Sequence, residues 1–126
     1  MAERNRQHPV VRALIYTVLF ALVATGLLWK LNVEGALLMK IHGAAAMASM
    51  VLFGALLARH VPCGWSVRAS RSSGVALLAS SLWLVISGYA LYYAGSEGLR
   101  AFASQTHFWI GVALVVTFGL HLRSPG

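Results

Sequence analysis

Four of the five histidines in this 126-residue chain lie inside or at the ends of long apolar blocks, where an ionisable side chain is costly. His42 and His60 are eighteen residues apart, which is five whole turns of an α-helix, so both rings project from one face. His107 and His121 are fourteen residues apart, just under four turns, and are offset by about 40° around the helix. The spacing therefore indicates two helices that each carry two histidines on nearly the same face.

Facing histidines suit axial ligation of haem iron, because each imidazole donates one ring nitrogen to an axial position. Zinc is the competing ligand, but it takes three or four protein ligands, and no carboxylate or cysteine lies in an apolar block to complete such a set. A proton relay would need intramembrane Asp or Glu; the chain has no Asp, and we place its three Glu in termini or loops. No Cys-x-x-Cys-His motif occurs, so we expect non-covalent, b-type haem.

The expected pairs of axial ligands follow from depth in the membrane. In an up-down bundle the two histidine-bearing helices run in the same direction, so His42 and His107 share one depth and ligate one haem. His60 and His121 share the other depth and ligate a second haem. Along its helix, His42 lies about 27 Å from His60, whereas His107 lies about 21 Å from His121. Helix tilt must therefore absorb the difference of about 6 Å between these two rows of histidines.

Two further patterns each have two interpretations. Phe53 and Phe118 both follow the first histidine of their block by eleven residues, so they fill the layer between two haems or simply pack in the core. Small residues recur every seven positions in the third block, a seam that admits either another helix or a flat cofactor. The members of this seam are Gly74, Ser81, Gly88 and Gly95. No internal repeat is convincing from the sequence.

The elements that position the histidines are membrane-spanning helices. Charged residues make up 10% of the chain, against about 25% in soluble proteins, and hydrophobic residues make up 59%. Each apolar block is near the ~20 residues that cross a bilayer, and only helices satisfy their backbone groups internally in such short segments. We expect one all-α domain, residues 1–126, folded as an integral membrane up-down four-helix bundle. The expected spans are residues 10–29, 36–61, 74–95 and 101–122.

Basic residues between the blocks predict the orientation of the chain. Seven lie on the side of the two termini: Arg4, Arg6, Arg12, Arg59, Arg68, Arg71 and Arg123. Only Lys30, Lys40 and Arg100 lie on the other side, so both termini are expected in the cytoplasm. The net charge of +7 forms no continuous patch or nucleic-acid-binding motif, so nucleic acid is not an expected partner. The lone Cys63 is expected to be a free thiol in a loop.

Two segments resemble a known family. MKIHGAAAMASMVLFGALLARH is similar to the second helix, and THFWIGVALVVTFGLHL to the fourth helix, of the di-haem b-type cytochromes of bacterial membranes. These include the membrane subunits of formate dehydrogenases and nickel–iron hydrogenases and a small quinol-oxidising cytochrome b. The resemblance implies an inner-membrane electron-transfer subunit with two b haems, quinone or quinol, and a redox protein partner. The resemblance thus implies an electron-transfer subunit that is not expected to be a catalyst on its own.

The first block departs from this family. In the family, His121 would pair with a histidine early in the first helix, but Ile15 and Tyr16 stand at that place. His60 is therefore the expected ligand, and His8, before the first block, is the alternative.

Two alternatives stay open for function. Tyr92, Tyr93, Glu97 and Arg100 either contact quinone or form an interfacial aromatic belt with its loop. The whole chain is either an electron carrier or a cofactor-free membrane helper, such as an assembly factor, a structural subunit or a small transporter.

Overall fold

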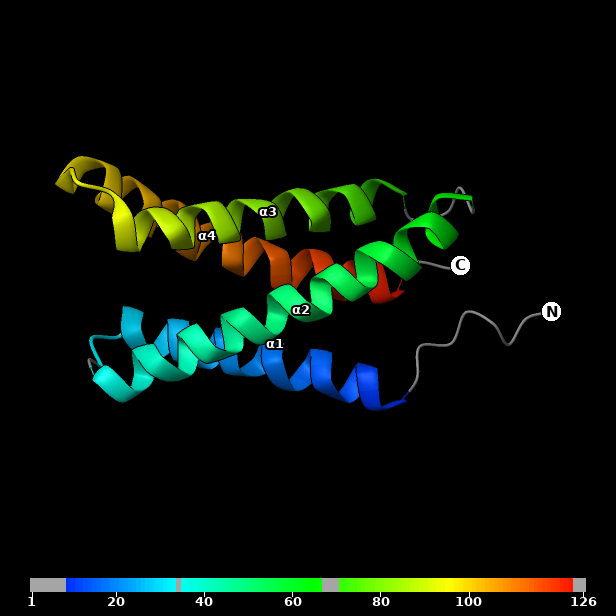
Figure 1. Ribbon diagram of the computed structural model, residues 1–126, viewed down its shortest axis with the longest axis horizontal. Coiled ribbons are helices and arrows are strands. Elements are labelled where there is room, and N and C mark those ends of the chain that lie inside the picture. The colour runs from blue at the N-terminus through cyan, green and yellow to red at the C-terminus, as the bar shows by residue number, and fades with distance from the viewer. Residues whose placement is uncertain (1–8, 34, 67–70, 124–126) are drawn as a thin grey trace. The chain divides into compact units, whose positions relative to one another are not determined.

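The computed structural model describes residues 9–33, 35–66 and 71–123 (Figure 1). These residues form four α-helices, which are α1 (Pro9–Lys30), α2 (Ala36–Ser66), α3 (Arg71–Tyr93) and α4 (Glu97–Arg123). Every one of the four contains a stretch long enough and apolar enough to cross a membrane. The prediction of an all-α, four-helix membrane protein is confirmed, and the chain is a multi-pass membrane protein.

The chain divides into two compact units, Met1–Ser66 and Val67–Gly126. In the first unit α1 packs against α2, and in the second α3 packs against α4. We call these pairs the first and the second hairpin. Within each hairpin the two helices run antiparallel and are joined by a short turn (Figure 1). Each hairpin therefore brings the end of one helix beside the start of the next.

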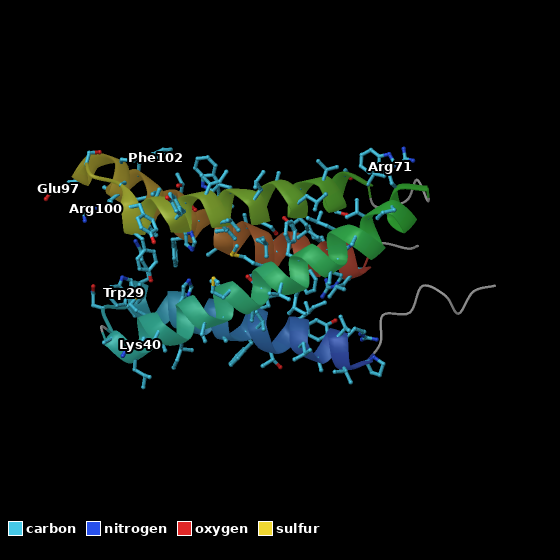
Figure 2. All side chains as sticks on the ribbon, viewed as in Figure 1. Trp29, Lys40, Arg71, Glu97, Arg100 and Phe102 are labelled. Carbon is cyan, nitrogen blue, oxygen red and sulfur yellow. The ribbon has the colours of Figure 1, made fainter. Side chains whose placement is uncertain are left out.

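The turn of the first hairpin is closed by Asn32, whose φ of 60° lies in the left-handed region. Its N–H donates to the carbonyl of Trp29 at 3.1 Å, and the N–H of Val33 donates to the carbonyl of Leu28 at 3.0 Å. These two bonds form a Schellman motif, which satisfies the last carbonyls of α1. Figure 2 shows Trp29 and Lys40 at this end of the first hairpin.

The turn of the second hairpin ends at Ser96, whose hydroxyl accepts a hydrogen bond from the N–H of Leu99 at 3.2 Å and caps α4. Glu97 occupies the first turn, where a carboxylate interacts favourably with the helix dipole. We expected α4 to begin at Ala101 and Glu97 to lie in a loop; the cap begins the helix four residues earlier. Glu97 and Arg100 lie at this turn, and Arg71 lies at the opposite end of the hairpin (Figure 2).

The end of α2 also differs from the expectation. We expected the span to end at Val61 and a loop to follow, whereas α2 continues to Ser66 and contains Pro62. Proline removes one helical hydrogen bond, but its fixed φ is compatible with a helix. Cys63 therefore belongs to α2 and not to a loop. The apolar part of α2 ends at Ala58, so the last turns of this helix extend beyond the candidate span.

Candidate functional site

Thr25 and Ser87 are the only buried polar residues in the part of the chain that the structure describes, with 7% and 2% of their surface exposed. Each lies on the first helix of its hairpin. A hydroxyl that is buried in an apolar environment costs free energy unless it is hydrogen-bonded. Both hydroxyls are bonded, and in both cases one partner is a histidine of the second helix.

In the first hairpin, the Oγ1 atom of Thr25 lies 2.7 Å from Nδ1 of His42. The same hydroxyl donates its proton to the backbone carbonyl of Ala21 at 2.6 Å, with Leu22 as a second acceptor at 3.2 Å. Because its only proton is directed to the backbone, Oγ1 accepts from the ring and Nδ1 is the donor. A neutral imidazole with its proton on Nδ1 carries its lone pair on Nε2, so the contact favours this tautomer of His42.

The second hairpin repeats this geometry. The Oγ atom of Ser87 lies 2.9 Å from Nδ1 of His107. The hydroxyl donates to the carbonyl of Trp83 at 2.7 Å, with Leu84 as a second acceptor at 3.3 Å. The same argument favours the same tautomer for His107, with the lone pair on Nε2.

A third histidine has a hydroxyl partner at the other end of the second hairpin. The Oγ atom of Ser73 lies 2.8 Å from Nδ1 of His121. Ser73 and Ser87 are fourteen residues apart on α3, the same interval that separates His107 from His121 on α4. The two contacts are therefore in register along the hairpin, about 21 Å apart.

Each of these hydroxyl residues is followed by a glycine that faces the same ring. A Cβ at Gly26 would lie 3.7 Å from Cε1 of His42. A Cβ at Gly88 would lie 3.6 Å from Cε1 of His107, and at Gly74 the distance to the third ring is 4.0 Å. The hydroxyl holds one edge of the imidazole and the glycine leaves room beside it. We call each such unit a histidine cradle: Thr25–Gly26 with His42, Ser87–Gly88 with His107, and Ser73–Gly74 with His121.

The cradles explain part of the small-residue seam of α3. Gly74 and Gly88 face histidine rings of α4 within their own hairpin, so at these two positions the seam admits a neighbouring helix. A Cβ at Gly95 would meet nothing within 4 Å. The two cradles of this hairpin lie fourteen residues apart on α3, which is twice the seven-residue interval of the seam.

Three of the four predicted ligands have described side chains, and the fourth does not. His42, His107 and His121 each occupy a cradle. His60 lies in α2, two residues beyond the end of the apolar span at Ala58, and its side chain is outside the described residues, as is the whole of His8. The pairings of His42 with His107 and of His60 with His121 join one hairpin to the other, and they stay predictions.

Sequence reasoning missed the three hydroxyl residues. The signal was a hydroxyl residue directly before glycine, at 25–26, 73–74 and 87–88, on the helix that precedes a histidine-bearing helix. The glycines of α3 were noted, but the serines before them were not.

Comparisons of the chain with protein-family models, with curated proteins and with solved structures find no match. Among the described side chains, no three of His, Cys, Asp and Glu are grouped as one metal site. Each cradle instead offers a single imidazole with its Nδ1 bonded, which is the arrangement that a metal-ligating histidine takes when an outer partner orients it. The residues present fit axial ligation of haem iron.

Proposed function

We propose that this chain is a membrane electron-transfer protein that carries b-type haem with two histidine ligands per iron. The observation that supports this most directly is the matched orientation of His42 and His107, whose Nδ1 atoms donate to buried hydroxyls so that Nε2 carries the lone pair. Haem would supply reversible one-electron transfer. The chain would supply ligation, orientation and the surroundings that set the potential.

Two haems per chain are proposed. His42 and His107 ligate one, each hairpin contributing one ring. His121 ligates the other together with His60, with His8 as the alternative partner. Because His107 and His121 are about 21 Å apart along α4, their two haems would lie at different depths and provide a path across the membrane.

The electron donor and acceptor are proposed from the family resemblance. The two segments similar to di-haem b-type cytochromes favour exchange with quinone or quinol on one side and with a redox protein on the other, in a bacterial inner membrane. Tyr92 and Tyr93 are 68% and 71% exposed at the end of α3, and Tyr89 stacks on Tyr93 with ring centroids 4.5 Å apart. Exposed tyrosines at a helix end suit an interfacial belt, and a contact of the same rings with a quinone head group is the alternative.

Pigment analysis tests the proposal. The full chain, produced with haem available and purified in detergent, is expected to be red and to give b-type bands in a pyridine-haemochrome assay at about two haems per chain. The physical reason is that two imidazoles hold low-spin iron without a covalent link to the porphyrin. A colourless, iron-free preparation would contradict the proposal and favour the cofactor-free helper.

Orientation is a separate prediction. The seven-to-three distribution of basic residues predicts that both termini lie in the cytoplasm. At either end of the chain, a fused reporter that works only in the cytoplasm is expected to be active, and one that works only in the periplasm is expected to be inactive. Periplasmic activity of a C-terminal fusion would reverse the sidedness of the cradles without affecting their chemistry.

A further inference from the structure

The Thr25 and Ser87 cradles match in every contact that defines them. The distances from the hydroxyl to Nδ1 are 2.7 and 2.9 Å, and those from the hydroxyl to the backbone carbonyl four residues earlier are 2.6 and 2.7 Å. A Cβ at Gly26 and at Gly88 would lie 3.7 and 3.6 Å, respectively, from Cε1 of the facing ring. Two cradles in different hairpins thus have one geometry.

The sequence around the two cradles also repeats. The segment before the first ring reads LVATG at residues 22–26, and that before the second reads LVISG at residues 84–88, an offset of 62 positions. On the second helix of each hairpin, His42 and His107 are each followed eleven residues later by Phe-Gly, an offset of 65 positions. The offset is 62 for the first helix of each hairpin and 65 for the second, which indicates that one pattern occurs twice. The second copy has three more residues between its hydroxyl and its histidine.

We infer that the two hairpins are copies of one module, and that Thr25 and Ser87 are equivalent positioning residues for the two axial imidazoles of a single haem. The proposal rests on the proposed function for the haem itself. The equivalence of the two hydroxyls comes from the contacts and the sequence of each hairpin.

Equivalent hydroxyls have a chemical consequence. An Nδ1–H that donates to a fixed oxygen gives the ring more imidazolate character, which makes Nε2 a stronger donor to ferric iron and lowers the reduction potential. Thr25 and Ser87 would act on the two sides of the same iron. Ser73, which holds His121, would act on the other haem.

The repeat is incomplete at the third cradle. With an offset of 65, the position equivalent to His121 is Leu56, and with an offset of 62 the positions equivalent to Ser73 and Gly74 are Val11 and Arg12. The third cradle therefore has no equivalent in the first hairpin. In the proposed arrangement the repeat would supply both ligands of one haem, His42 and His107, whereas His121 of the other haem has no equivalent in the first hairpin.

Redox titration of the haem-loaded full chain tests the inference. The variants are Thr25→Val, which keeps the shape and removes the hydroxyl, Ser87→Ala and Ser73→Ala. Ser81→Ala is the matched control, because Ser81 lies between the two cradles on the same seam of α3. Thr25→Val and Ser87→Ala are expected to raise the midpoint potential of the same haem by similar amounts and to change its low-spin electron paramagnetic resonance signal. Ser73→Ala should shift the midpoint potential of the other haem only, and Ser81→Ala should shift neither potential. Thr25→Ser, which keeps a hydroxyl, should have the potential of the unmodified chain.

Two results would overturn the inference. In the first, Thr25→Val and Ser87→Ala shift the midpoint potentials of different haems; in the second, both variants leave the potentials and spectra unchanged. A merely structural role would lower haem content without this selective shift. A second measurement is independent of haem: ¹⁵N spectra of histidine-labelled, haem-free full chain should show the Nδ1–H tautomer for His42 and His107, lost in the respective hydroxyl variants. If the unmodified chain binds no haem, the proposed function fails, and these spectra alone decide whether the hydroxyls are equivalent.

Discussion

Replacement of His42 or of His107 by alanine is expected to remove one haem and leave the chain with about half of its haem content. The expectation follows from the two cradles, in which Nδ1 of each ring lies against a hydroxyl and Nε2 is the nitrogen proposed to ligate iron. A single imidazole cannot supply both axial ligands of a low-spin iron, so the haem that loses one of its two histidines is expected to be released, while the other haem stays bound. Haem content per chain and the low-spin absorption spectrum measure the effect.

The double variant His42→Ala with His107→Ala provides the sharper comparison. If both rings serve one iron, removing the second costs nothing further, and the double variant keeps the same single haem as either single variant. His121→Ala is the matched control, because its cradle lies at the other end of the second hairpin and its loss should remove the other haem. Loss of both haems in the double variant, with one lost in each single variant, would show that His42 and His107 ligate different irons.

His60→Ala is expected to abolish the second low-spin haem, whereas His8→Ala leaves both in place. His60 shares a helix face with His42, and it lies four residues, or one turn, beyond Leu56, the position equivalent to His121 in the repeat. One extra turn rises about 6 Å, which is the amount by which the separation of His42 and His60 exceeds that of His107 and His121. Haem content and the low-spin spectrum of each variant decide between the two ligands.

A rescue variant tests the depth of this site. In Leu56→His combined with His60→Ala, the new ring follows His42 by fourteen residues, the interval from His107 to His121. We expect this double variant to regain the haem that His60→Ala loses, and Leu57→His with His60→Ala, which points the ring about 100° away, to remain without it. If His60→Ala retains both low-spin haems while His8→Ala loses one, the assignment of His60 is wrong and the first segment supplies the ligand.

The helices and their histidines were accessible from the sequence because hydropathy and helical spacing encode them directly. All four spans were predicted within a few residues, except at the start of α4 and the end of α2. Those two boundaries depend on local features that hydropathy does not record, namely the Ser96 cap and a proline that the helix tolerates.

The partners of the histidines were not accessible in the same way. Serine and threonine occur at many positions in apolar helices, and nothing in the sequence says which of them will meet a ring on a neighbouring helix. Thr25 and Ser87 became recognisable only when the packing of each hairpin showed them buried against His42 and His107. The repeat was missed for a related reason, since the two copies share few residues outside the cradles.

The cradles have a consequence for biogenesis. Each of the three described rings finds its hydroxyl on the helix made immediately before it, within the same hairpin. A polar group that enters hydrocarbon without a partner costs several kcal/mol, so a lone histidine-bearing helix partitions poorly into lipid. A nascent α1–α2 or α3–α4 pair carries its own polar partner and can leave the translocon as a unit. Insertion of the polypeptide would thereby be separated from capture of the proposed haem, which could be added to rings that are already oriented.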